Sequence, residues 1–390
     1  MITATVAVSG LIALVWIFVQ FRAVLQFRRI TWSVDLAPAG PDGLPSLSVV
    51  IPACNEEEHL EEALGSILAQ SYPGLQIILV NDRSTDGTPA IMRRIASADS
   101  RIEVLDIDTL PRGWLGKVHA LHQGLKSATG ELVLFTDADV HFAPGFLAKA
   151  AAYLSARDLD HLAVGPEART ARFWQEAANN YFGGVFYLGL NIADLETPGS
   201  DAFVGVGAFN LFRRQALDRT PGLEWLRMEI LDDVGLGYML KRAGARSGFL
   251  LGFNELWLDW YPSVRGMIQG LEKNIFGGTC RFSYLRLALL TLFSLAILLG
   301  PVVALLQPVM LWPRLLAIAA AAACAYAAFH FRRRTGRRWW PMFLAPAAGL
   351  ILLYTVIRSG WKCRQRGGIQ WRGTFYPVEE LRAGQRVRVF

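Results

Sequence analysis

Hydrophobic positions are concentrated at the two ends of the chain, and the N-terminal run is the simplest to interpret. Positions 3–21 carry no charged side chain, and Arg22, Arg28 and Arg29 follow. An uncharged run of this length predicts a transmembrane helix better than a buried core helix. The arginines behind it predict a cytosolic C-terminal flank. Because a signal peptide carries its basic residues before the apolar run, we expect residues 1–30 to be a retained anchor.

From residue 46 onward, short apolar runs alternate with helical segments. Such runs are typical of buried parallel strands, which are covered on both faces. Strands that alternate with helices predict an α/β fold with a mostly parallel sheet and right-handed crossovers. No Gly-x-Gly-x-x-Gly follows the first strand, which argues against a dinucleotide-binding oxidoreductase. The predicted strands are Leu47–Ile51, Leu75–Val80, Ile102–Ile107 and the start of the stretch Glu131–Val140.

The pattern changes after residue 155. Phe173–Leu190 predicts an aromatic-rich helix that is apolar on all sides. Such a stripe is either core or a ledge for an apolar substrate or the bilayer surface. A strand is expected over Phe203–Phe212, where small residues such as Gly207 would let a ligand approach. Further helices are expected from Asn55 as N-cap to Gln70, over Glu229–Arg242 and over Ser263–Arg281.

Apolar segments return at 287–306, 309–331 and 339–357, and an arginine-rich stretch at 332–338 should stay in the cytosol. If the last segment crossed the membrane, the basic tail behind it would lie outside, against the same rule. Prolines and a glycine interrupt that segment, so we interpret it as interfacial or re-entrant. The expected division is an anchor (1–30), a globular domain (46–285), C-terminal membrane helices (286–358) and a cytosolic tail (359–390) with a short strand and a polar turn.

Composition supports this membrane assignment. The chain of 390 residues is 53% hydrophobic and 18% charged, and its mean hydropathy is +0.30. Its formal net charge of +6 lies largely beside the apolar runs, which favours a membrane surface over nucleic acid as partner. The 4 cysteines lack metal-site spacing and suit a reducing compartment. We therefore expect an integral protein of the inner or cell membrane with a cytoplasmic domain.

Two carboxylates end the fourth predicted strand. Asp137 and Asp139 are separated by Ala138, and Asp82 ends the second strand in the same way. Ligands of open α/β sheets bind beyond the carboxyl ends of the strands. Paired acids at that edge suit a divalent cation, which usually bridges protein carboxylates to substrate phosphates. A strand that simply ends in an Asp-containing turn is the alternative interpretation.

The sequence resembles the family 2 glycosyltransferases of GT-A fold over roughly residues 46–285. It is most similar to membrane-bound lipid glycosyltransferases, namely the ceramide glucosyltransferase group and enzymes associated with hopanoids and carotenoids. The plan of one N-terminal anchor and a C-terminal hydrophobic block is also similar. The motifs that carry the resemblance are Val49–Glu56 (VVIPACNE), Val80–Thr88 (VNDRSTDGT), Gly116-Lys117, Thr136–Asp139 (TDAD) and Asp232-Asp233.

The resemblance implies a nucleotide-sugar donor, with a UDP-glucose-like molecule as the commonest case. The backbone around Pro52 and Ala53, together with Glu56 and Asp82, would hold the base and ribose. Lys117 would lie near the nucleotide or the sugar.

The resemblance also implies the catalytic groups. Asp137 and Asp139 would hold the metal-bound diphosphate, with Asp139 the more direct ligand of Mg²⁺ or Mn²⁺. Asp233 would be the general base and Asp232 the acid that precedes it, where the family more often has Glu. A base opposite the leaving diphosphate implies inversion at the sugar and a lipid hydroxyl as acceptor. That acceptor would enter along the Phe173–Leu190 helix and the basic helix behind it.

The sequence departs from the family at two places. Arg83 stands where the family more often has Gly. The Gln/Arg-x-x-Arg-Trp motif is absent from its usual place, so either Lys273 replaces its arginine or the tail residues Gln370, Trp371 and Arg372 supply it. By the resemblance, these tail residues and Gly207 are expected on the acceptor side. Two alternatives to a lipid glycosyltransferase remain at this stage: a processive polysaccharide synthase, for which the hydrophobic segments look too few, and a non-catalytic nucleotide-sugar-binding membrane protein.

Overall fold

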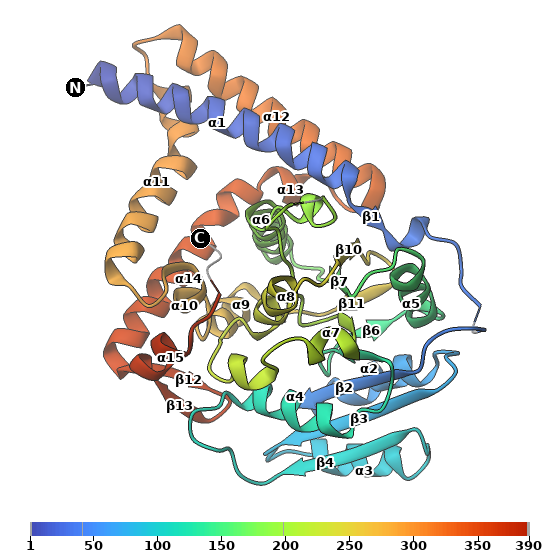
Figure 1. Cartoon of the computed structure of the whole chain (residues 1–390). Coiled ribbons are helices and arrows are strands. Elements are labelled where there is room, and N and C mark those ends of the chain that lie inside the picture. The colour runs from blue at the N-terminus through green and yellow to red at the C-terminus, as the bar shows by residue number, and fades with distance from the viewer. Residues whose placement is uncertain (1, 41, 198, 388–390) are drawn as a thin grey trace.

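The computed structural model describes residues 2–40, 42–197 and 199–387. It places an α/β domain beneath a group of long apolar helices (Figure 1). The N-terminal helix α1 (Ile2–Arg29) lies beside α12 (Leu311–Thr335) at the top, and α11 (Tyr284–Leu306) leads down from them to the domain. The C-terminal segment returns to the α/β domain, so both ends of the sequence contribute to one body.

The core of the domain is an eight-stranded sheet with the order β1-β10-β7-β9-β5-β2-β3-β4. Strand β9 runs antiparallel to both of its neighbours, and the other pairs are parallel. The central strands consist of buried apolar residues, as expected for strands covered on both faces. The strands are β1 (Thr31–Trp32), β2 (Leu47–Ala53), β3 (Leu75–Asp82), β4 (Ile102–Ile107), β5 (Leu132–Phe135), β7 (His161–Gly165), β9 (Asn210–Arg213) and β10 (Ser247–Leu251).

Helices cover both faces of this sheet, and the smaller strands form two separate sheets. A three-stranded sheet has the order β6-β11-β8, and β12 with β13 forms a separate hairpin. The small strands are β6 (His141–Phe142), β8 (Glu167–Ala168), β11 (Leu256–Leu258), β12 (Gly368–Trp371) and β13 (Thr374–Pro377). The helices are α2 (Leu60–Leu68), α3 (Thr88–Ala96), α4 (Gly116–Ser127), α5 (Phe146–Ala156), α6 (Phe173–Gly189), α7 (Arg214–Asp218), α8 (Asp232–Arg242), α9 (Val264–Leu271), α10 (Ile275–Cys280) and α15 (Val378–Gly384).

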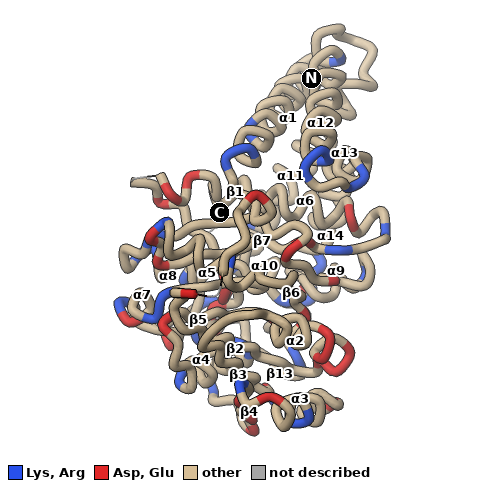
Figure 2. Tube along the Cα trace, turned by 90° about the vertical axis from the view of Figure 1, so that its right-hand side faces the viewer, with Lys and Arg blue, Asp and Glu red and all other residues tan. Residues whose placement is uncertain are grey.

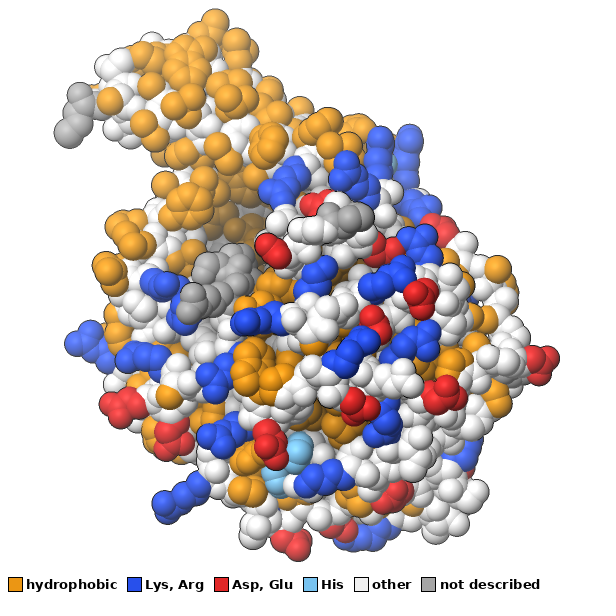
Figure 3. All heavy atoms as spheres, in the orientation of Figure 1, with side chains coloured by type: hydrophobic (Ala, Val, Ile, Leu, Met, Phe, Trp, Pro, Cys, Tyr) orange, Lys and Arg blue, Asp and Glu red, His pale blue; other side chains and the backbone are white. Residues whose placement is uncertain are grey.

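Within the described residues, three helices are long and apolar enough to cross a membrane: α1, α11 and α12. Their outer surfaces form a continuous hydrophobic region in Figure 3. Basic side chains gather where α1 and α12 end above the α/β domain (Figure 2). There Arg28 donates to His330 at 3.5 Å and Arg334 pairs with Asp35. The basic ends of both helices thus face the same side, the side of the domain.

The last apolar segment behaves differently from α11 and α12. It forms the short helix α13 (Trp340–Phe343) and then α14 (Ala345–Arg366), which packs against α6, α10 and α11. Close approaches at Gly349, against Tyr181, and at Gly360, against Leu287, fix this packing. Helix α14 is not among the candidate membrane spans. It delivers the tail to the α/β domain, which removes the conflict between a fourth crossing and a basic tail.

Three expected elements differ from the structure. Of the expected strand 203–212, only residues 210–212 lie in the sheet, as part of β9 (Asn210–Arg213). The expected basic helix 263–281 is interrupted between α9 and α10. Asn55 is no N-cap, because α2 begins only at Leu60; instead Asn55 has φ 58° and its Oδ1 accepts the backbone N–H of Thr85 at 2.7 Å.

Candidate active site

The carboxyl ends of β2, β3 and β5 open into one cavity of about 1020 Å³. Predicted residues from distant parts of the chain line it together, as expected for ligands beyond the strand ends. The exception is Gln370, which is exposed on β12 and is not part of the lining. The predicted residues in the lining are Pro52, Ala53, Glu56, Asp82, Lys117, Asp137, Asp139, Gly207, Asp232, Asp233, Lys273, Trp371 and Arg372.

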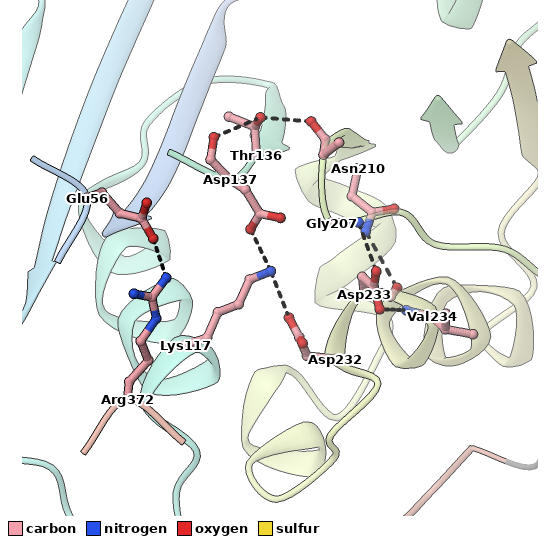
Figure 4. A network of polar contacts seen from close by, with 11 residues as sticks. Glu56, Lys117, Thr136, Asp137, Gly207, Asn210, Asp232, Asp233, Val234 and Arg372 are labelled. Atoms are coloured by element: carbon pink, nitrogen blue, oxygen red, sulfur yellow. Dashed lines mark hydrogen bonds and ion pairs between the residues drawn. The ribbon is translucent and has the colours of Figure 1, made fainter. Parts of the chain in front are cut away.

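Gly207 is the point at which the central groups converge (Figure 4). Its backbone N–H donates to Asp233 Oδ2 at 2.9 Å. A Cβ added to Gly207 would lie 2.9 Å from Asp137 Oδ2, 3.3 Å from Lys117 Nζ and 3.5 Å from Asp233 Oδ2. The carboxylates of Asp137 and Asp233 therefore lie within a few ångströms of one backbone position.

Small residues before β9 explain how Asp233 reaches this position. A Cβ at Gly205 would collide with the backbone carbonyl of Asp233, and a Cβ at Gly237 would collide with that of Val204. The loop and the first turns of α8 therefore pack backbone against backbone. The sequence suggested that these small residues admit a ligand; at Gly205 they admit helix α8 instead.

Lys117 links the two acidic motifs. Its Nζ lies 2.6 Å from Asp137 Oδ1 and 3.7 Å from Asp232 Oδ2. Burial opposes the charge of this lysine, but Asp137 and Asp232 outweigh burial and raise the pKa of Lys117. In this arrangement the ammonium group neutralises part of the carboxylate cluster.

Asp233 has the environment of a general base. Its Oδ1 accepts the backbone N–H of Val234 at 2.8 Å, which fixes the carboxylate at the start of α8. Burial, followed by the charge of Asp232, raises the pKa of Asp233 to about 6. A base with a pKa near the working pH is the most efficient proton acceptor.

Asp137 and Asp139 fit a divalent cation that shares its coordination with a substrate. Among the described residues, no three or more His, Cys, Asp or Glu side chains are grouped closely enough to hold a metal ion by themselves. Burial, then the charges of Asp137 and Glu56, raises the pKa of Asp139 to about 7. A cation would relieve this excess of negative charge, and magnesium-type sites often use only one or two carboxylates with substrate phosphates.

Two basic residues from the C-terminal part complete the polar end. Lys273 Nζ lies 4.3 Å from the centre of the Trp371 ring, a cation–π contact. Burial, then the charge of Lys117, lowers the pKa of Lys273 to about 8. Arg372 pairs with Glu56, on the loop predicted to hold the nucleotide. The sequence predicts Arg372 on the acceptor side; in the structure it pairs with Glu56, a residue that the resemblance assigns to the donor.

Sequence reasoning missed three contributors. Arg83 forms a double hydrogen bond with Asp82, at 2.7 and 3.1 Å. Tyr376 Oη accepts the backbone N–H of Gly116 at 3.1 Å. Glu229 is fully buried and binds backbone N–H groups of the C-terminal segment, three residues before the acidic pair. No sequence spacing indicates the contacts of Tyr376 and Glu229, because they join segments far apart in the chain.

The other end of the cavity is apolar. It is formed by helix α6 and by the apolar helices above it, so it extends from the carboxylates toward the hydrophobic surface. On α6, Phe182 packs against Trp260 with ring centres 4.7 Å apart. The lining from the other helices includes Trp16 and Val19 of α1, Ser294 and Ile297 of α11, Ala327 and Phe331 of α12, and Gly349 and Leu353 of α14.

The fold is of the GT-A type, with attached apolar helices. Residues 48–220 match Glycosyl transferase family 2 and form a domain of that family. A solved structure described as the mannosyltransferase PcManGT from Pyrobaculum calidifontis in complex with GDP-Man and Mn²⁺ shares this fold, with a TM-score of 0.53 and 21% identity. The similarity covers 91% of this chain and 99% of the PcManGT chain.

Curated relatives extend the similarity beyond the domain. The 4,4'-diaponeurosporenoate glycosyltransferase of Staphylococcus aureus strain MRSA252 is 25% identical over 344 residues, which cover 86% of this chain and 89% of the relative. The enzyme of the same description from strain bovine RF122 / ET3-1 is 26% identical over 348 residues, with the same coverage. These relatives and the family 2 domain together support a glycosyltransferase.

Proposed function

We propose that this protein is a membrane-bound inverting glycosyltransferase that moves a hexose from a nucleotide sugar to a membrane lipid. The observation that carries this proposal is the single cavity with two unlike ends. Its polar end contains Asp137, Asp139 and Asp233, and its other end is lined by apolar helices. A volume of about 1020 Å³ is at the upper limit of small-molecule sites.

The chemistry follows from Asp233. Its carboxylate takes the proton of the acceptor hydroxyl as the acceptor oxygen attacks the anomeric carbon. The bond from that carbon to the diphosphate breaks, and the nucleoside diphosphate leaves with the bonding electrons. Attack from the side opposite the leaving group inverts the sugar. Backbone bonds from Gly207 and Val234 hold the carboxylate for this step.

The donor is a nucleotide sugar, and we propose a UDP-hexose with Mg²⁺ or Mn²⁺. Asp139 and Asp137 would hold the cation, which when bound offsets the negative charge that develops on the leaving diphosphate. The description of the Pyrobaculum structure names GDP-Man and Mn²⁺, so GDP-mannose is the competing donor to test. Lys117 would then give up part of its contact with Asp137 and face the diphosphate or the sugar.

The acceptor is a long apolar molecule that reaches the carboxylates from the bilayer between α6 and the apolar helices. The relatives are named for diaponeurosporenoate, a carotenoid-type carboxylate. A carotenoid-type lipid fits the long apolar end of the cavity. A hydroxyl acceptor needs Asp233 to remove its proton, whereas a carboxylate acceptor is already ionised at neutral pH.

The test uses the purified full chain in lipid nanodiscs with UDP-glucose or GDP-mannose and Mn²⁺. A carotenoid-type acceptor that bears either a hydroxyl or a carboxyl group is added to the reaction. The lipids are then extracted and analysed by mass spectrometry. We expect a hexose mass increment on a lipid product and release of the nucleoside diphosphate. Nucleotide release that never yields a glycosylated lipid, or a growing polysaccharide in its place, would contradict the proposed acceptor.

A further inference from the structure

The hairpin β12–β13 at the C-terminal side of α14 has an unusual turn. Its two central residues are Arg372, with φ 47°, and Gly373, with φ 78°. Two positive φ values are typical of the tight hairpin turns that match strand twist. Glycine adopts this conformation freely, but an arginine adopts it at a cost. A side chain held in such a conformation often serves a functional contact.

The turn brings Arg372 to the loop after β2. Its guanidinium pairs with Glu56, and Nη1 lies 3.5 Å from the backbone carbonyl of Asn55. Asn55 and Glu56 belong to the first donor motif. The arginine side chain is 46% exposed and lines the cavity, so its other donors remain accessible to a ligand.

Two more contacts attach the same hairpin to the other donor loops. Arg83 Nη1 donates to Thr374 Oγ1 at 3.1 Å, and Gly116 N–H donates to Tyr376 Oη at 3.1 Å. Arg83 belongs to the second motif and Gly116 to the third. The hairpin therefore touches the donor loops at three separate places.

Arg83 is also held in a left-handed conformation, with φ 58°. This explains why a glycine would suit the position. The arginine bears the conformational cost of a positive φ and in return binds Asp82 and Thr374. Arg83 thus contacts the hairpin that carries Arg372, and Arg372 in turn contacts the loop after β2.

Charge at this end favours a cationic partner for a diphosphate. Carboxylates outnumber cationic side chains there, and Lys117 is already engaged by Asp137 and Asp232. A diphosphate adds further negative charge. Arginine binds phosphate oxygens through its planar fork of donors, and Arg372 is the cation that the hairpin contributes.

We propose that the β12–β13 hairpin is a wall of the donor-nucleotide site, in which Arg372 binds the nucleoside diphosphate while Arg83 and Thr374 latch the hairpin to the base-binding loop. This proposal rests on the proposed function and deepens it. It moves Arg372 from the acceptor side to the donor side. In the absence of donor, Glu56 holds the guanidinium in place.

The test measures binding of UDP and of GDP, each with Mn²⁺, to the full chain in nanodiscs by calorimetry, without acceptor. Arg372→Ala should weaken binding of the preferred nucleotide about tenfold or more, because a charge-assisted hydrogen bond is lost. Arg372→Lys should restore part of the affinity by keeping the charge. Where lipid transfer is measurable, the KM for the donor should rise and that for the acceptor should stay unchanged.

Arg366→Ala is the matched control. This arginine lies at the end of α14, just before the hairpin, is 45% exposed and pairs with Glu272 at 3.3 Å. It lies outside the cavity lining, so nucleotide affinity should match that of the wild type. Equal affinity in Arg372→Ala and wild type, with a raised acceptor KM, would return Arg372 to the acceptor side and overturn the proposal.

A second variant tests the latch. Arg83→Gly relieves the positive-φ strain but removes the guanidinium that binds Asp82 and Thr374, so nucleotide affinity should drop severalfold, measured at a temperature where circular dichroism shows the variant folded. Unchanged affinity in this variant would contradict the latch. A wild-type chain that binds neither UDP nor GDP would contradict the proposed function itself, an outcome distinct from failure of the hairpin variants.

Discussion

The two ends of the cavity are built in opposite ways. At the donor end, charged side chains come from short motifs at the ends of neighbouring strands, such as Asp82 and Asp137. At the acceptor end, apolar side chains come from long helices that are far apart in the sequence, such as α1 and α14. The donor end depends on exact placement of few groups, whereas the acceptor end depends on the shape of a surface. Substitutions should therefore separate the two ends kinetically.

The largest expected effect comes from the base that stands between the two ends. Asp233→Asn keeps the shape of the side chain but cannot accept a proton, so kcat with a hydroxyl acceptor should fall by about 10²–10⁴. Nucleotide affinity should be nearly unchanged. Transfer rates with paired hydroxyl and carboxyl acceptors check this. A loss confined to the hydroxyl acceptor identifies the base, and normal turnover with that acceptor would remove Asp233 from the role.

Removal of the metal should lower sugar transfer by acting at the donor end of the cavity alone. EDTA should lower transfer by at least about tenfold, because the leaving diphosphate loses its counter-charge, and Mn²⁺ or Mg²⁺ should restore it. Asp139→Asn should raise the metal concentration needed for half-maximal activity. The activity is measured as nucleotide release at varied metal concentration. Full activity in chelator would refute the assignment of Asp137 and Asp139.

A bulky side chain placed in the acceptor end should weaken acceptor binding and leave nucleotide binding unchanged. Ala327 lines the cavity from α12, and Ala327→Phe should raise the acceptor KM by roughly tenfold, about 1.4 kcal/mol. Nucleotide affinity should stay the same. Ala321→Phe is the control, because Ala321 lies on the same helix, is exposed and is absent from the lining. Equal effects of both substitutions would place the lipid elsewhere.

The smallest effect is the dependence on pH. The pKa of Asp233 is raised to about 6, so its carboxylate becomes protonated as the pH falls through that value. Because the base must be ionised, kcat should be about half-maximal near pH 6 and about tenfold lower near pH 5. A rate profile from pH 5 to 8 with a hydroxyl acceptor measures this. The acid limb should disappear in Asp233→Asn.

The sequence was a good guide to the donor end because local rules apply there. Strand ends in a parallel sheet share one edge, so Asp82 and Asp137 could be placed together before any coordinates. The family 2 domain and the mostly parallel sheet were confirmed. The roles of the individual site residues remain predictions.

The rest depended on long-range packing. The strand expected over 203–212 is short because Gly205 and Gly237 let backbone segments approach where a ladder would otherwise form. The hairpin reaches the donor loops through a contact between Arg372 and Glu56, which are separated by 316 positions. Hydrophobic periodicity predicts which face of a helix or strand is buried, but it does not predict which other part of the chain packs against that face.

Helix α14 has a consequence for how the two substrates influence each other. One stretch of it borders the lipid end through Gly349 and Leu353, and the same rod passes through Gly367 into the turn that carries Arg372. On the proposed function, a lipid that shifts α14 should alter nucleotide affinity, and by thermodynamic reciprocity the nucleotide should alter lipid affinity by the same factor. We therefore expect the affinity for the sugar donor to depend on the length of the acceptor.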